Sequence, residues 1–260
     1  MISITSGQIE ALVAAYFWPF VRILAFVLSA PVFGNPSMPL QLRIGLAALL
    51  SFIIAPLVAL PHIDPLSLPG VAVLAQQIVI GVTLGLTLRI IFVATEAAGE
   101  FVGLQMGLGY ATFFDPERAD QVPVLGQFLG LLTTLVFLAL DGHLQVVQVL
   151  ARSFATIPIG GGMHAGGLLT LAYWGSAIFS AGVMLAMPLL AALLIANLAL
   201  GVLTRAAPQL NLFAVGFPVT LALGLITLAL SLPFFTPVLQ QLFDAGYATM
   251  MKATQEFALR

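Results

Sequence analysis

Long apolar runs alternate along the chain with short polar turns rich in proline and glycine. Each run is too long for a strand and has the length of a helix. A helix needs about 20 apolar residues to cross the hydrocarbon layer of a bilayer. The pattern therefore predicts an all-α membrane protein with about six long, proline-kinked hydrophobic helices. The runs occupy residues 11–30, 40–60, 70–94 with a glycine-rich continuation, 124–150 with an interruption at 141–143, 168–203, and 211 onward.

Composition agrees with a membrane location. Hydrophobic residues make up 61% of the 260 residues and charged residues only 7%, whereas soluble domains carry about a quarter charged residues. A chain this apolar is expected to have membrane lipid or other apolar protein around it. The net charge of -2 is small and unclustered, so it gives no reason to expect nucleic acid. The chain has no cysteine, which excludes disulfides and thiolate chemistry.

The glycine-rich stretch 157–167 is predicted to be a linker between two parts of the chain, residues 1–156 and 168–260. The run 168–203 would measure roughly 54 Å as one helix at 1.5 Å per residue. Because the hydrocarbon layer is only ~30 Å thick, this helix must tilt, kink at Pro188 or project beyond the lipid. The last run contains Pro218, Pro233 and Pro237 before a mildly amphipathic tail over residues 239–260.

Four arginines lie inside or at the ends of apolar runs: Arg22, Arg43, Arg89 and Arg205. A mid-membrane arginine costs ~2.5–3.5 kcal/mol, so such residues usually face a cavity or a partner. Arg43 and Arg89 are close enough to helix ends to extend toward the interface. Arg22 lies too far inside its apolar run to reach the interface in this way.

Three glycines, Gly99, Gly103 and Gly107, recur every four residues and are predicted to share one helix face. In lipid, such a face lets another helix approach closely. We therefore expect these glycines to pack directly against a second helix. Weaker pairs with the same spacing occur at Gly81 and Gly85 and at Gly126 and Gly130.

Glu96 and Glu100 lie four residues apart on nearly the same face as these glycines. They are either a proton-relay pair or polar residues that face a wet interior or pair with arginines of other helices. Together with Arg205 they would form the polar pathway of a secondary transporter for a small solute, although no inverted repeat supports that class. The sequence has no zinc-type histidine spacing, no nucleophile elbow and no phosphate loop, so we predict a protein that is not an enzyme and needs no cofactor or metal.

The segment 110–123 is polar and aromatic at once, with Tyr110, Phe113 and Phe114 beside a cluster of charges. Aromatic residues often rest at the membrane interface, which favours an ordinary aqueous loop. The alternative is a re-entrant loop, which is tolerated at membrane depth only where protein buries it or where it lines a cavity.

A second polar corner, residues 204–211, joins the last two runs. Pro208 should end the first of these helices near Arg205, and Asn211 can cap the second. Arg205, Gln209 and Asn211 thus meet where one helix has free carbonyls and the next has free amides. Taken alone, the corner is a well-capped turn at the membrane edge.

The stretch LGVLTRAAPQLNLFAVGFP around this corner resembles the C-terminal signature of the FliR/SctT-like family of type III secretion export-gate proteins. GLQMGLGYATFFDP, which begins at Gly103, is similar to the central region of that family. The pattern of Arg22, Pro31 and Pro36 is similar as well, so the resemblance extends over the full length. Phe217 after Ala-Val-Gly favours the flagellar branch.

The resemblance implies a core subunit of the flagellar protein export gate in the bacterial plasma membrane, within the flagellar basal body. It implies a FliP-like part over 1–156 and a FliQ-like helical hairpin with a C-terminal tail over 168–260. Residues 110–123 would be the plug of the conduit, with Phe113 and Phe114 at the constriction. The implied partners are FliP, FliQ, FlhB, FlhA and the exported flagellar proteins.

Overall fold

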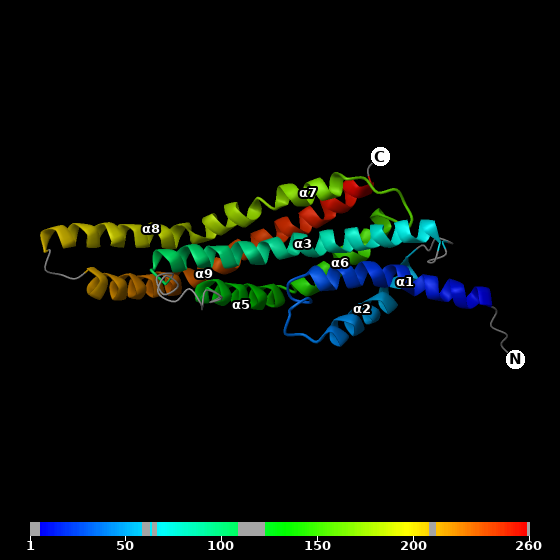
Figure 1. Cartoon of the computed structure of the whole chain (residues 1–260), viewed down its shortest axis with the longest axis horizontal. Helices are drawn as coiled ribbons and strands as arrows, with labels where there is room; N and C mark the ends of the chain where they lie inside the picture. Colours follow the sequence, from blue (N-terminus) through cyan, green and yellow to red (C-terminus); the bar gives the residue numbers. More distant parts are fainter. Residues whose placement is uncertain (1–5, 59–62, 64–66, 109–122, 208–211, 259–260) are drawn as a thin grey trace. The chain divides into compact units, whose positions relative to one another are not determined.

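A computed structural model of the chain describes residues 6–58, 63, 67–108, 123–207 and 212–258. Regular structure within these residues is helical, as the apolar runs predicted (Figure 1). The helices are α1 (Ser6–Ser29), α2 (Leu40–Ile54), the short 3-10 helix η1 (Ala55–Leu57), α3 (Leu68–Gln105), α5 (Val124–Ala139), α6 (Gly142–Thr156), α7 (Gly166–Trp174), α8 (Ala177–Ala206) and α9 (Leu212–Ala258).

In the described residues, four helical stretches are long and apolar enough to cross a membrane. They are Leu40–Leu57, Leu68–Gln105, Gly166–Ala206 and Gly216–Ala258. The number rises to five if the broken pair α5 and α6 forms one span. The predicted class, an all-α membrane protein, is confirmed.

The helix boundaries differ from the predicted runs at two places. The interruption at residues 141–143 does break a helix, and Asp141 there has a left-handed φ of 54°, a conformation that aspartate tolerates better than most residues. The run 168–203, which we expected to be one helix, instead breaks between Trp174 and Ala177. Pro188, where a kink was one of the three expected possibilities, lies inside the helix α8.

The last helix is longer than its prolines indicated. α9 continues for 47 residues through Pro218, Pro233 and Pro237, and includes the tail that we expected to follow them. Each proline removes one backbone hydrogen bond, but apolar helices tolerate this where neighbouring groups satisfy the freed carbonyl. The continuous apolar sequence thus keeps α9 helical, although prolines usually end or kink a helix.

By internal contacts the chain forms two compact units, and each unit is assembled from separate stretches of sequence. The first unit contains Met1–Ile90, Asp141–Gly175 and Phe243–Arg260, and the second contains Ile91–Leu140 and Ser176–Leu242. These units are defined by contacts, and the predicted division of the sequence at 157–167 into FliP-like and FliQ-like parts stays a prediction.

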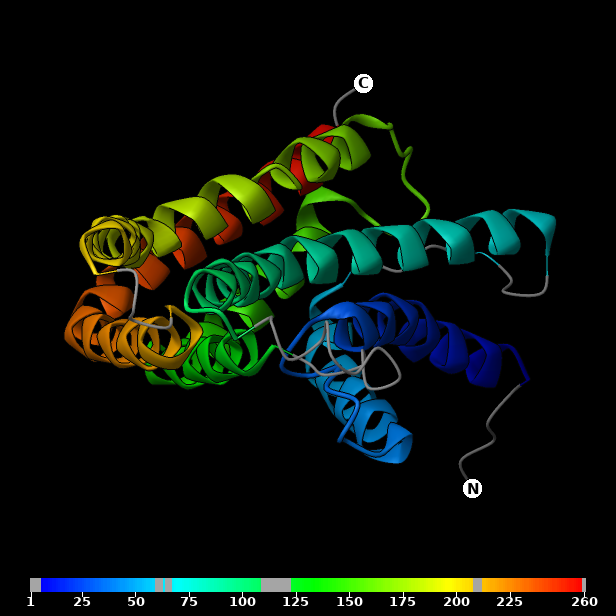
Figure 2. The same ribbon diagram turned by 60° about the vertical axis from the view of Figure 1, so that its left-hand side comes forward.

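In the first unit, α1 packs on α2 and along the N-terminal part of α3 (Figures 1 and 2). Ser51 on α2 donates a hydrogen bond to the Tyr16 carbonyl on α1 (3.1 Å), and Trp174 on α7 donates to the Thr87 carbonyl on α3 (3.0 Å). α7 lies beside the C-terminal end of α9, where the ring of Phe257 fills the space next to Gly167. Fully buried residues of this unit include Trp18, Arg22, Ile23, Phe26, Ile80, Leu84 and Leu88.

In the second unit, α8 and the first part of α9 run side by side in opposite directions (Figures 1 and 2). The C-terminal part of α3 and α5 complete the unit, with side chains from all four helices in one apolar core. The most buried of these core residues are Ala98, Val102, Met106, Leu129, Ala186, Leu189 and Leu193.

Candidate functional site

Arg22 occupies the centre of the first unit and is fully buried, with 0% of its side chain exposed. Its Nε donates to Gln77 Oε1 (2.8 Å), one terminal nitrogen donates to Ser153 Oγ (3.2 Å), and the other donates to the Ile157 carbonyl (2.9 Å). The guanidinium carbon also lies 4.1 Å from the ring centroid of Phe154, within cation–π distance. The predicted requirement of Arg22 for a partner is thus met inside the chain, by α3 and α6.

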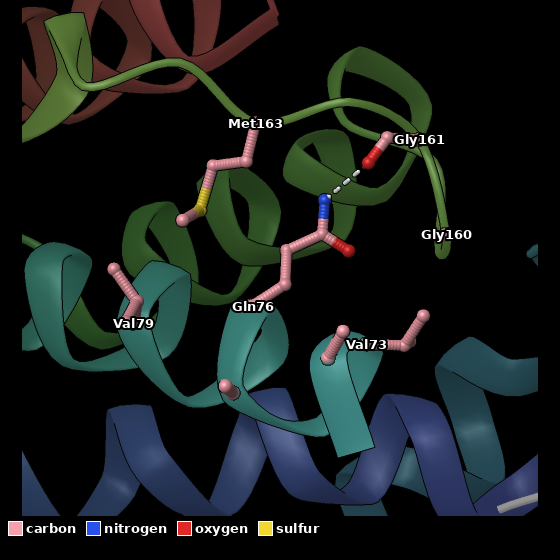
Figure 3. A pocket seen from close by; sticks show the side chains of 8 residues that line it. Val73, Gln76, Val79, Gly160, Gly161 and Met163 are labelled. Atoms are coloured by element: carbon pink, nitrogen blue, oxygen red, sulfur yellow. Dashed lines mark hydrogen bonds between the residues drawn. The ribbon is translucent and has the colours of Figure 1, made fainter. Parts of the chain in front are cut away.

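The polar contacts continue beyond Arg22 along α3. Gln77 Nε2 donates to Gln76 Oε1 (3.2 Å), and Gln76 Nε2 donates to the Gly161 carbonyl (2.6 Å). Figure 3 shows this last bond beside a cavity of about 450 Å³. The cavity is otherwise lined by small or apolar residues: Ala72, Val73, Ala75, Val79, Gly160 and Met163.

The glycine-rich segment is held in place on both sides, although its composition indicated a linker. Gln76 binds its Gly161 carbonyl, and the His164 amide donates to the Phe257 carbonyl (3.0 Å). A Cβ at Gly166 would lie 2.9 Å from the Glu256 carbonyl oxygen, so close packing requires glycine here.

The remaining apolar-run arginines lie nearer the surface. Arg43 is half-buried and donates to the carbonyls of Met38 (3.0 Å) and Asn35 (2.7 Å) in the loop before α2. Arg89 is exposed on α3, and Arg205 is exposed in the last turn of α8. A cation at that position interacts favourably with the free carbonyls at the helix end.

Glu96 and Glu100 are both exposed and lie where α3 meets α5. A Cβ at Gly130 would lie 2.9 Å from Glu96 Oε1, and one at Gly126 would lie 3.5 Å from Glu100 Cγ. The glycines of α5 therefore make room for the two carboxylate side chains. Both interpretations, a proton-relay pair and polar residues that face a wet interior or pair with arginines of other helices, stay predictions.

The glycines predicted to share one helix face differ from one another. A Cβ at Gly99 would lie 2.6 Å from the backbone of Leu125 and Gly126, so α3 and α5 approach there as closely as their backbones allow. Gly103 has ordinary space, with Leu125 Cδ1 3.8 Å from its Cβ position. Gly107 lies two residues beyond Gln105, the last residue of α3, and has a φ of 84°, so its placement on that helix face was wrong. The regular spacing continued past the point where the helix ends.

Some predicted site residues fall outside the described residues. They are Tyr110, Phe113 and Phe114 of the plug and Pro208, Gln209 and Asn211 of the corner.

Sequence reasoning missed several residues that the structure brings together. Gln76 and Gln77 form the link from Arg22 to Gly161, and two adjacent glutamines in an apolar run were a usable signal. Gly81 and Gly85, which appeared only as a weak pair, lie against α1. A Cβ at Gly81 would meet the Arg22 carbonyl and lie 2.8 Å from Ala25 Cβ.

Comparison with known proteins identifies the family. The family model described as "Bacterial export proteins, family 1" matches residues 13–246. The chain belongs to this family. It is 46% identical over 247 residues to a flagellar biosynthetic protein FliR of Pectobacterium carotovorum, with 94% of each chain covered. It is 40% identical over 260 residues to the FliR of Escherichia coli, with 100% of each covered, and 30% identical over 248 residues to that of Bacillus subtilis, with 94% and 96% covered.

Membership in this export family confirms the resemblance and the functional class that it implied. The chain is a component of the flagellar protein export apparatus in the bacterial inner membrane, and its family is non-enzymatic. The hydrogen bonds of Arg22 and the close contacts at the glycines of α3 therefore belong to the structure of an export protein.

Proposed function

We propose that this chain forms one wall of a protein-conducting channel, together with FliP and FliQ and in association with FlhB and FlhA. Unfolded flagellar proteins would be its substrates, and residues 110–123 would close the channel when it is idle. The proposal starts from membership in the export family and goes on to the surfaces that the chain leaves uncovered.

The observation that carries the proposal is the unequal covering of the long helices. Within its most apolar window, 67% of the span that contains α3 is buried by the rest of the chain. The corresponding values are 33% for Gly166–Ala206 and 22% for Gly216–Ala258. Large apolar side chains are exposed along both, among them Met187, Ile195, Leu198, Val202, Ile226, Leu230 and Phe234. These faces need lipid or other helices beside them.

Glycines on these exposed apolar faces favour other helices, and not lipid, as the neighbours that cover them. Among the described residues, a Cβ at Gly201 on α8 would meet nothing within 4 Å apart from its own stretch of helix, and the same holds for Gly45 on α2. Glycine lowers helix propensity without a packing gain inside the chain. In membranes, small residues commonly mark the places where a second helix approaches. A partner helix seated at Gly201 accounts for the glycine, whereas lipid does not require it.

The plug is proposed from residue chemistry at the end of α3. Gly107 takes a left-handed conformation just after this helix, so the chain leaves the helix axis before residue 110. Phe113 and Phe114 are bulky and apolar, and such side chains exclude water from a narrow opening. The charged residues Asp115, Glu117 and Asp120 would keep the outer edge hydrated.

Copurification tests the assembly. A tagged chain, coexpressed with FliP and FliQ and extracted in mild detergent, should migrate on native gels as one complex with both. Gly201→Leu should reduce recovery of the partners while leaving the chain's own abundance unchanged, because among the described residues an added Cβ there has nothing within 4 Å. Gly162→Leu is the matched control, because an added Cβ there also meets nothing within 4 Å but the residue lies between α6 and α7 and on no exposed helix face. A homo-oligomer that transports a small solute without either partner would overturn the proposal.

Cells test the plug separately. A deletion of residues 110–114 should leave the complex assembled and make growing cells sensitive to small ions, since the membrane potential leaks through an open channel. Unchanged growth with an assembled complex would place the barrier in another part of the apparatus.

A further inference from the structure

Buried arginines usually have an acidic partner, and Arg22 has none in the part of the chain that the structure describes. Its three hydrogen bonds go to an amide oxygen, a hydroxyl and a backbone carbonyl, and a phenyl ring lies against its face. Burying an ionised group is costly unless it is well hydrogen-bonded. The three neutral hydrogen-bond acceptors and the phenyl ring therefore have to offset the cost of burying the Arg22 charge.

The Ile157 carbonyl is well placed to stabilise the buried positive charge of Arg22. Ile157 follows the last residue of α6, where helix carbonyls lack intrahelical donors and carry partial negative charge. Arg22 donates to this carbonyl, and through Gln77 and Gln76 it is connected to the Gly161 carbonyl four residues later. One buried cation thus holds the first and the last residue of the five-residue segment 157–161.

The segment then continues to another anchored part of the same unit. The His164 amide is bound to the Phe257 carbonyl near the end of α9, and Gly167 packs on the Phe257 ring. The wall of the cavity in Figure 3 is formed by this segment and by α3. A shift of residues 157–161 would change both the cavity and the path of the chain into α7.

We propose that Arg22 is a positioning residue that fixes the segment 157–161 through Gln77 and Gln76. The guanidinium suits this role because its planar fork presents several donors in fixed directions. A lysine at this position has one flexible ammonium group and cannot hold the glutamine, the hydroxyl and the carbonyl in the same geometry. Ile157 and Ile159 are buried, whereas Gly160 and Gly161 provide no side chains to pack, so the C-terminal end of the segment depends most on such anchors.

Site-directed spin labelling of the full-length chain in lipid nanodiscs tests the proposal. The chain lacks cysteine, so one introduced thiol takes the label cleanly. Gly162→Cys reports on the segment, and Gly45→Cys reports on α2 in the same unit. Both positions accept a side chain, because an added Cβ would have nothing within 4 Å.

Arg22→Met and Gln76→Leu should each shorten the rotational correlation time of the label at position 162 severalfold and leave the label at position 45 unchanged. Arg43→Met removes an arginine whose hydrogen bonds, within the described part of the chain, go to its own loop, and it should leave the label at 162 unchanged. An immobile label at 162 in both variants would overturn the proposal. Equal mobilisation at 162 and 45 would also overturn it, since Arg22 would then support the whole unit and not this segment. If Arg22→Met fails to accumulate, Gln76→Leu decides alone, because it removes the distal link and leaves the Arg22–Gln77 bond in place.

Discussion

The two units fill their interiors in different ways. The first buries a charged side chain, Arg22, together with Gln76, Gln77 and Ser153, and joins them by directional hydrogen bonds. The second has an apolar core formed by α3, α5, α8 and α9, in which Leu189 and Leu193 are among the most buried residues. A hydrogen-bonded network specifies one arrangement and fails when a donor is lost, whereas an apolar core tolerates exchanges that conserve volume.

The largest contrast should come from the same substitution in both interiors. Arg22→Met keeps most of the side-chain volume but leaves three buried acceptors without their donor, at ~1–3 kcal/mol for each unsatisfied group. Leu189→Met also keeps volume and should cost less than about 1.5 kcal/mol. Thermal unfolding of the detergent-solubilised chain measures both. Equal losses of stability would mean that the hydrogen bonds of Arg22 do not distinguish the first unit from the second.

The glycine contacts should give the next largest effect. Gly99→Ala places a Cβ 2.6 Å from the backbone of α5, which cannot move aside without separating the helices. Overpacking of this kind costs roughly 1–3 kcal/mol, so assembly on native gels should fall. Gly103→Ala, with its nearest atom at 3.8 Å, should be close to neutral. An effect of Gly103→Ala as large as that of Gly99→Ala would show that position on the face matters more than backbone distance.

The smallest effect on this chain's stability is expected at the corner. Arg205 is exposed in the last turn of α8, so Arg205→Ala should remove only the favourable interaction with the helix end, worth about 0.3–1 kcal/mol. Motility should nevertheless fall if the corner, by its place between the last two helices, contributes to export. Soft-agar swimming and thermal unfolding, measured on the same variant, separate the two. Normal swimming would show that the corner is not essential.

Helices and membrane character could be predicted because they depend on local pattern. Long apolar runs have few alternatives to helix in a bilayer, and the break at Asp141 was marked by a polar interruption. The break before α8 was not predicted, since Gly175 and Ser176 are weak signals inside an apolar run. The prolines of α9 were misleading in the opposite direction.

The site was only partly predictable because its contacts are distant in sequence. Arg22 was singled out by the cost of burying charge, but Gln77 lies 55 residues away and Ser153 lies 131 residues away. Regular spacing selected Gly99, Gly103 and Gly107, but Gly99 lies against the backbone of α5, Gly103 has ordinary space, and Gly107 lies beyond the end of α3. A spacing rule identifies a possible face and does not say where a second helix crosses it.

The central claim, that this chain provides both a wall and the plug of an export channel, is tested most directly by the conductance of the assembled complex. The complex with FliP and FliQ should be purified and inserted into planar bilayers, with Phe113 and Phe114 both changed to Ala. Phe179→Ala, which removes an exposed phenyl group from α8, serves as the control. We expect the parent and the control to be closed to small ions and the double variant to conduct while its subunit composition stays the same. A double variant that assembles fully and stays as ion-tight as the parent would contradict the account.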